Sequence, residues 1–212
     1  MLIRGLVRPG DCARTTIGIV ERQRRMPHTN MLEERLAALV VVDVQEKMLA
    51  AIGTAPPEAI LDKIHRLVGT AQTLGLPIIY TEQYPQGLGP TEAGLKAGLA
   101  SATGPIVKTT CSCWRDENFR AALQRADRPQ IIVAGLETHV CIQQTVMDLI
   151  RVDYQVFVPA DAIGSRFAGD MNVSLDRMRT AGAELSTTES LIFELIERCD
   201  HPKFREVLKL VK

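Results

Sequence analysis

From Leu32 to the end of the chain, short β-branched runs alternate with segments of helical periodicity. ALVVVDV, residues 38–44, is nearly continuously apolar, as a parallel strand covered by helices on both faces requires. The next segment has apolar residues at helical spacing between Pro57, which suits a first helical turn, and Gly75, which suits a helix end. Because such units repeat, the sequence predicts an α/β fold with a six-stranded parallel, Rossmann-like sheet and helices on both faces.

The same patterns place each element along the chain. Strands are predicted at residues 38–44, 76–83, 105–110, 130–135, 154–162 and 184–189. Helices are predicted at residues 55–75, 116–126, 138–152, 171–182, 190–199 and 201–211.

Residues 1–30 differ from the rest of the chain. They contain six Arg against Asp11 and Glu21, a formal charge of about +4, and they lack strand or helix periodicity. A transit peptide would also be Arg-rich, but the acidic residues and the lack of an amphipathic helix favour a disordered extension. We therefore predict an extension at 1–30 that adds little to stability or activity, and one domain at 31–212. Met26 and Met31 remain alternative starts.

The composition argues against several classes of partner. Lys plus Arg and Asp plus Glu each number 25, so the charge balance does not indicate nucleic acid binding. The longest apolar stretch, residues 36–44, is too short to span a bilayer and contains Asp43, so no membrane association is expected. Five cysteines scattered through 212 residues are typical of free thiols in a reducing compartment, and we expect a cytoplasmic protein.

Three reactive side chains lie at the ends of predicted strands: Asp43 after VVV, Lys108 after PIV and Cys141 just after IIVAG. Each alone has an ordinary explanation, as a helix cap or ion-pair partner, a solvated lysine or a packed cysteine. Ligands of open parallel sheets bind beyond the carboxyl ends of the strands. A base, a cation and a thiol at one such edge are the groups that covalent acyl transfer needs.

Cys141 is expected in the first turn of a helix that begins near Thr138 or His139. There the positive end of the helix dipole, together with Lys108, is expected to lower the pKa of the thiol. Asp43 is the carboxylate expected to accept the thiol proton and return it to a leaving amine.

Several segments resemble, in order, the isochorismatase-like cysteine hydrolase family, and most closely its isochorismatase domain-containing proteins. From about residue 36 onward they are VVDVQEKML, IIYTEQYPQGLGPT, IVKTTCSCW, AGLETHVCIQQTVMDL, DRMRTAGAELSTTESLIFELI and HPKF. The resemblance implies a Rossmann-like isochorismatase-fold domain, an Asp43–Lys108–Cys141 triad and hydrolysis of a small amide or related carbonyl compound. It also implies a non-proline cis peptide between Leu136 and Glu137, and we expect the N–H groups of Glu137 and Cys141 to form an oxyanion hole.

The chain departs from parts of this family. YTEQYPQGLGP lacks the histidine of the metal-binding nicotinamidases, so no metal or other cofactor is predicted. Cys141 is present where the isochorismatases lack it, which disfavours vinyl-ether hydrolysis and keeps that activity as an alternative. Cys111 replaces an aromatic residue that is common in the nearest relatives. A zinc site of Cys111, Cys113 and Cys141 is a weaker alternative to packed free thiols.

Five further residues near the strand ends are assigned to the substrate pocket: Gln45, Glu82, Gln83, Tyr84 and His139. For those that follow the second strand, a solvated loop is an equal alternative. The spacing of His139 and Cys141 directs the two side chains to different faces of a helix, so His139 is interpreted as pocket wall rather than as a base.

The sequence therefore predicts a metal-independent cysteine hydrolase that acts on a small-molecule amide through a thioester. A catalytically silent binding or scaffold protein of the same fold is the rival hypothesis. A homo-oligomer, at least a dimer, is expected from the resemblance and from the apolar stretch SLIFELIERC, residues 190–199. The sequence leaves the substrate open.

Overall fold

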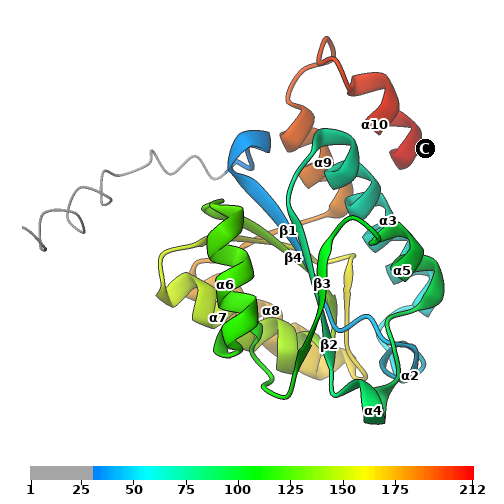
Figure 1. Cartoon of the computed structure of the whole chain (residues 1–212), viewed down its shortest axis with the longest axis vertical. Helices are drawn as coiled ribbons and strands as arrows, with labels where there is room; N and C mark the ends of the chain where they lie inside the picture. The colour runs from blue at the N-terminus through cyan, green and yellow to red at the C-terminus, as the bar shows by residue number, and fades with distance from the viewer. Residues whose placement is uncertain (1–30) are drawn as a thin grey trace, which may run out of the picture. The chain divides into compact units, whose positions relative to one another are not determined.

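The computed structural model describes residues 31–212, which form one compact unit (Figure 1). The prediction of a disordered extension concerns residues 1–30, which lie outside the described residues. Within the described part, no helix combines the length and apolar character that crossing a membrane requires.

A parallel sheet forms the centre of this unit, with the strand order β3-β2-β1-β4-β5-β7. The predicted six-stranded parallel sheet is confirmed, and the structure adds a short strand, β6, which pairs with β4. The strands are β1 (Ala37–Val42), β2 (Ile78–Gln83), β3 (Thr103–Lys108), β4 (Gln130–Leu136), β5 (Gln155–Pro159), β6 (Ile163–Gly164) and β7 (Glu184–Ser186).

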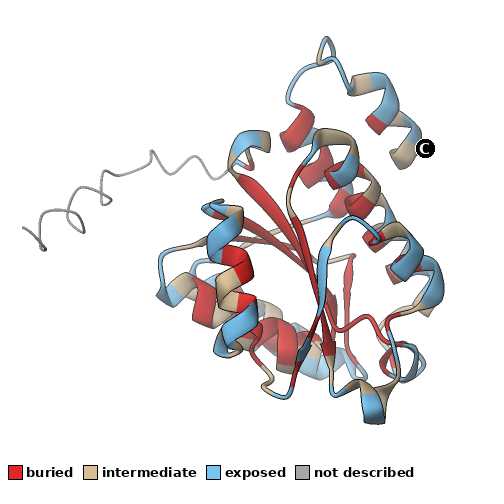
Figure 2. Ribbon diagram, in the orientation of Figure 1, coloured by how far each residue is buried: buried red, intermediate tan, exposed pale blue. Residues whose placement is uncertain are grey.

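Helices cover both faces of the sheet, as predicted (Figure 1). One face packs against α3, α9 and α10, and the other against α6, α7 and α8. Figure 2 shows the consequence, because the central strands are buried while the outward faces of the helices are exposed. The helices are α2 (Glu46–Leu49), α3 (Pro57–Leu74), α4 (Pro85–Leu88), α5 (Ala93–Gly98), α6 (Glu117–Ala126), α7 (Gln143–Arg151), α8 (Ala168–Ala181), α9 (Thr188–Ile196) and α10 (Phe204–Val211).

α3 illustrates how the sequence determines an element. Pro57 begins it, where an N–H would lack an intrahelical partner anyway, and Gly75 ends it with a left-handed φ of 72°. Ile60, Ile64 and Leu67 lie on one face and are buried in the core. Helices α2, α4 and α5 were not predicted, because segments of four to six residues are too short to show a helical period.

The strand register brings the carboxyl ends of four neighbouring strands to one edge of the sheet. Val42 of β1 pairs with Thr81 of β2 and with Gly135 of β4. Gln83, the last residue of β2, pairs with Lys108, the last residue of β3. Residues that follow these strands therefore leave the sheet at the same edge, where binding sites on parallel sheets form.

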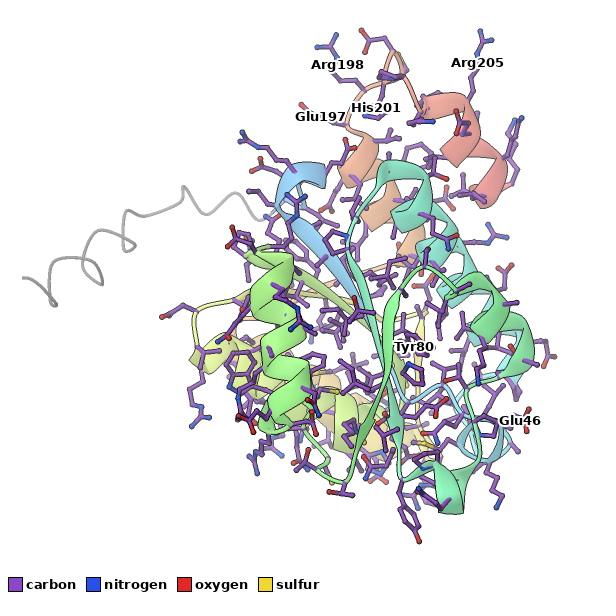
Figure 3. All side chains as sticks on the ribbon, viewed as in Figure 1. Glu46, Tyr80, Glu197, Arg198, His201 and Arg205 are labelled. Atoms are coloured by element: carbon purple, nitrogen blue, oxygen red, sulfur yellow. The ribbon has the colours of Figure 1, made fainter. Side chains whose placement is uncertain are left out.

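The residues labelled in Figure 3 help to locate the two ends of the sheet. Glu46, the first residue of α2, marks the end at which β1 leaves the sheet, and Tyr80 lies within β2. The opposite end, around the connection from α9 to α10, carries the labelled residues Glu197, Arg198, His201 and Arg205. The predicted site residues belong to the first of these ends.

Gly135 is the point of closest approach of β4 to β1. Its φ is 134°, which L side chains rarely adopt, and a Cβ there would lie 2.1 Å from the carbonyl oxygen of Val42. We expect Gly135→Ala to lower the free energy of unfolding by roughly 2–5 kcal/mol, because the backbone of a central strand cannot move aside. Urea unfolding followed by circular dichroism measures the change.

Gly169→Ala is the matched control. A Cβ at this exposed position in the first turn of α8 has no neighbour within 4 Å outside its own helix. Alanine there should leave stability unchanged or raise it by up to about 1 kcal/mol. Equal stability of the two variants would contradict the close approach at Gly135.

Candidate functional site

An ion pair between Asp43 and Lys108 lies at the carboxyl edge of the sheet. Lys108 Nζ is 2.6 Å from Asp43 Oδ2, and both side chains are fully buried. The Thr81 hydroxyl, from the strand between them, donates to Asp43 Oδ1 at 2.7 Å. Two buried charged groups need an opposite charge and hydrogen bonds close by, because removing an ion from water costs several kcal/mol. β1, β2 and β3 therefore meet through these three side chains.

The Lys108 ammonium stays charged despite its burial. Burial lowers the pKa of Lys108, but the nearby Asp43, Cys113 and Cys141 groups raise it, and the net pKa lies above its ordinary value. Its Nζ also donates to Gln83 Oε1 at 2.7 Å. The lysine was predicted near the end of a strand, and it is the last residue of β3.

Cys141 is the third member of the cluster. Its sulfur lies 3.8 Å from Lys108 Nζ, the same atom that pairs with Asp43, and only 4% of its surface is exposed. The structure thus brings together all three side chains that the sequence predicted to meet.

The predicted lowering of the Cys141 pKa is wrong. Burial raises the pKa of this thiol above its ordinary value, Asp43 raises it further, and Lys108 only partly opposes them. The sequence argument counted the helix end and the lysine but not the loss of water around the sulfur. Cys141 is therefore a protonated thiol in the resting protein.

The chain reaches Cys141 through a sharp turn after β4. Glu137 has a left-handed φ of 58°, and residues Thr138–Ile142 form a π-helical turn that leads into α7. The Glu137 carbonyl accepts from the N–H groups of Val140 at 2.9 Å and Ile142 at 3.3 Å. The helix that was predicted from Thr138 thus begins with a wider turn than an α-helix has.

The prediction of a cis peptide between Leu136 and Glu137 is wrong. Among the described residues the cis peptide bond is Gly104–Pro105, so the Leu136–Glu137 bond is trans. The chain changes direction through the positive φ of Glu137 instead, which costs less than a non-proline cis bond at about 3 kcal/mol.

His139 lies away from the thiol. Its Nδ1 is 3.0 Å from the Ser165 hydroxyl, and its Nε2 is 3.2 Å from the Arg166 guanidinium. Arg166 also donates to both carboxylate oxygens of Glu137, at 3.2 Å and 3.3 Å. His139 therefore belongs to a polar cluster with Ser165, Arg166 and Glu137, and its role as pocket wall stays a prediction.

Gln45 and Glu82 are buried and are bonded within the protein. The Gln45 amide accepts from the Gln83 N–H at 2.7 Å and donates to the Gln83 carbonyl at 3.0 Å. Glu82 Oε1 accepts from the N–H and the hydroxyl of Thr91, each at 2.8 Å. Their polar atoms hold the loop that follows β2, so the solvated loop does not describe Glu82, while the pocket role of both residues stays a prediction.

Gln83 and Tyr84 differ from each other. Gln83 reaches Lys108 and so joins the cluster. Tyr84 is 55% exposed, has a positive φ of 37° and places its ring against Gly87 of α4. Of the five residues assigned to the pocket, Gln83 is the one in contact with the buried charges.

Sequence reasoning missed Thr81 and Arg166. Thr81 carried a signal, since it is a polar residue in an otherwise apolar part of a predicted strand, and its hydroxyl contacts Asp43. Arg166 carried none, because its contact with Glu137 joins segments 29 residues apart.

Two other features bear on the chemistry of this edge. Among the residues that the structure describes, no group of three or more His, Cys, Asp or Glu side chains is arranged to hold a metal ion. A surface hollow of about 310 Å³ lies at the amino ends of β2 and β3, beside Pro77, Ile78 and Thr103. This hollow lies at the other end of the strands from the Asp43–Lys108–Cys141 cluster, and no charged side chain lines it.

Fold and cluster together define an α/β protein with a thiol, an ammonium and a carboxylate at the carboxyl edge of a parallel sheet. The Isochorismatase domain model matches residues 37–190, and the chain belongs to the isochorismatase family. A similar curated protein is isochorismatase domain-containing protein 2A of Mus musculus, 38% identical over 175 residues that cover 82% of each chain. Family membership supports a hydrolase of this superfamily.

Solved structures of the same fold are also similar. The MAR1 ribonuclease of Caenorhabditis elegans is 39% identical with a TM-score of 0.80, covering 85% of this chain and 92% of that one. YcaC of Pseudomonas aeruginosa, solved with covalent acrylamide, is 26% identical with a TM-score of 0.81, covering 86% and 92%. YcaC of Escherichia coli, an octameric hydrolase of unknown specificity, is 27% identical with a TM-score of 0.78, covering 87% and 97%.

The Asp43–Lys108 pair should make a large difference to stability. We expect Lys108→Met to lower the free energy of unfolding at neutral pH by roughly 3–5 kcal/mol, because it leaves the Asp43 carboxylate buried without its cation. Urea unfolding at pH 7 measures the loss.

Lys63→Met provides the control. Lys63 forms a longer pair with Asp161, at 3.9 Å, and both side chains are about one-third exposed. Its replacement should change stability by less than about 1 kcal/mol. If Lys108→Met lowers the free energy of unfolding no more than Lys63→Met does, the buried pair does not hold the three strands together.

Proposed function

We propose that this protein is a metal-independent cysteine hydrolase that cleaves a small amide or related carbonyl compound through a thioester on Cys141. The observation that carries the proposal is that Lys108 Nζ lies against both the Cys141 sulfur, at 3.8 Å, and the Asp43 carboxylate, at 2.6 Å. A thiol beside a carboxylate base and a cation has the groups that nucleophilic acyl transfer needs.

The raised pKa of Cys141 determines the order of events. A resting thiol cannot attack, so its proton passes to Asp43 as the sulfur approaches the carbonyl carbon. Lys108 then faces the sulfur as it loses its proton and offsets the developing negative charge. The S–C bond forms while the carbonyl π electrons move to oxygen.

Breakdown of this intermediate returns the proton. The oxygen lone pair re-forms the carbonyl, the C–N bond breaks, and the Asp43 proton goes to the leaving amine. A water molecule then attacks the thioester with Asp43 again as base, which releases the acid and restores the thiol. The N–H groups of Glu137 and Cys141 are the oxyanion donors in this proposal, because both lie at the turn that precedes α7.

Covalent acrylamide on YcaC of Pseudomonas aeruginosa supports a small amide as the ligand class, because acrylamide is itself a small unsaturated amide. The other hypotheses remain as arms of the test: vinyl-ether hydrolysis, a silent scaffold, and RNA cleavage, which the name of the Caenorhabditis elegans relative raises. The equal numbers of acidic and basic residues do not favour RNA.

Cys141→Ala should abolish hydrolysis of any amide that the wild type cleaves, a loss of at least about 10³-fold, since the bond-forming atom is gone. Asp43→Asn should also lower turnover by orders of magnitude. A panel of small amides, vinyl ethers and a short RNA, assayed for ammonia and for product mass, identifies the reaction.

Cys199→Ala is the control, because Cys199 is an exposed free thiol outside the cluster. It should keep full activity. Retained amide hydrolysis in Cys141→Ala would refute the assignment, and wild-type protein inactive on the whole panel would favour the scaffold.

We also propose that the protein assembles into a homo-oligomer of at least two subunits. The apolar stretch that motivated this prediction is mostly buried within one chain, since Leu191, Ile192 and Leu195 of α9 lie in the core. The support comes from octameric YcaC of Escherichia coli and from Phe167 and Val173, each 62% exposed around the start of α8.

Light scattering on the purified chain tests the assembly. We expect a mass of at least twice the 23.4 kDa of one chain at micromolar concentration. Phe167→Ser should shift that mass toward the single chain, while Tyr84→Ser, another exposed aromatic, should not. A wild-type mass of one chain would end the proposal.

A further inference from the structure

Lys108 Nζ has more acceptors in range than it has hydrogens. An ammonium carries three N–H donors. Its neighbours are Asp43 Oδ2 at 2.6 Å, Gln83 Oε1 at 2.7 Å, Thr110 O at 3.1 Å, Cys111 O at 3.3 Å and Cys141 Sγ at 3.8 Å. Because the acceptors compete, the directions of the three N–H bonds decide how strongly Lys108 acts on the sulfur.

Gln83 is one of the two nearest acceptors, and its amide is held in one orientation. Gln83 Nε2 donates to the Thr109 carbonyl at 3.1 Å, so Oε1 is the atom that faces the ammonium. Lys108 has no acceptor to offer, and a flipped amide would place donor against donor.

Gln45 holds the main chain of Gln83 from the other side. Its fully buried side chain bonds both the N–H and the carbonyl of Gln83, at 2.7 Å and 3.0 Å. The same Gln45 Nε2 donates to the Gly89 carbonyl at 2.6 Å, which ties this pair to the loop after α4. Gln83 is thus fixed at its backbone and at its side chain.

We propose that Gln83, held by Gln45, is a positioning residue that keeps the Lys108 ammonium between Asp43 and Cys141. The inference deepens the proposed function and rests on it, since Lys108 matters to the reaction only through the sulfur. The amide does two things. It orients the ammonium by accepting one hydrogen bond, and it adds no charge, so the positive charge of Lys108 is shared between Asp43 and the sulfur.

The charges that act on Cys141 come from three segments. Asp43 follows β1, Lys108 ends β3, and Cys113 lies in the short 3₁₀ turn Cys113–Arg115. Asp43 and Cys113 oppose ionisation of Cys141, and Lys108 favours it. A carboxylate in place of the Gln83 amide would add a negative charge that also opposes ionisation of Cys141.

Gln83→Glu tests this in the full-length protein, because it keeps the shape and changes the charge. The readout is the rate of Cys141 alkylation by iodoacetamide, followed by peptide mass spectrometry between about pH 7 and pH 10. We expect alkylation at least about tenfold slower at each pH, as a rise of one unit in the thiol pKa would produce. Gln83→Met, which removes the acceptor, should also slow alkylation, but less.

Gln86→Glu is the matched control, because it adds the same charge three residues away on exposed α4. Its alkylation rate should equal that of the wild type. If both Gln83 variants melt at lower temperature but alkylate like the wild type across the pH range, Gln83 is only structural and the inference is overturned. If Gln83→Glu does not fold, the same comparison with Gln83→Met decides.

The alkylation rate does not depend on turnover, so the two proposals can fail separately. Slower alkylation in the Gln83 variants, with a wild type that hydrolyses nothing, would sustain the positioning role and refute the proposed hydrolase. Hydrolysis that depends on Cys141, together with unchanged alkylation in the Gln83 variants, would sustain the proposed hydrolase and refute the positioning role of Gln83.

Discussion

The buried ion pair of Asp43 and Lys108 is the interaction on which the site depends. The two residues stand at the ends of β1 and β3, which are not neighbours, so their side chains meet across the end of β2. Desolvation of both charges is expensive and is offset only with good geometry and further hydrogen bonds. Two residues of β2 supply these bonds. The Thr81 hydroxyl donates to the Asp43 carboxylate, and the Gln83 side-chain oxygen accepts from the Lys108 ammonium. One pair thereby fixes how three strands end.

That pair also sets the chemical state of the thiol. A buried sulfur beside a carboxylate keeps its proton, and the ammonium alone does not reverse this. The site is thus unlike one that stores a thiolate at a helix end. In the mechanism that we propose, the thiol ionises only as its proton moves to Asp43 and the negative charge passes to a carbonyl oxygen.

The sequence predicted those features that local patterns determine, and failed where solvation decides. Continuous β-branched runs and helical spacing were enough for the parallel sheet, and strand ends were enough to group Asp43, Lys108 and Cys141. The raised pKa of Cys141 depends on how completely the packed chain excludes water, which no local pattern reports. The hydrogen bonds of Gln45 to Gln83 join segments 38 residues apart and were equally invisible.

Three residues at this edge, Asp43, Tyr84 and Glu137, adopt a backbone conformation that glycine would adopt more easily. Asp43 and Glu137 follow neighbouring strands, β1 and β4, and have φ values of 53° and 58°. A left-handed conformation costs a residue with a side chain about 1–2 kcal/mol, and a chain that needed only to turn would carry glycine at both places. Asp43 bonds Lys108, and Glu137 bonds Arg166. At Asp43 and Glu137 the strained turn also presents a carboxylate that pairs with a cation, and this is the pattern expected of backbone strain at a functional site.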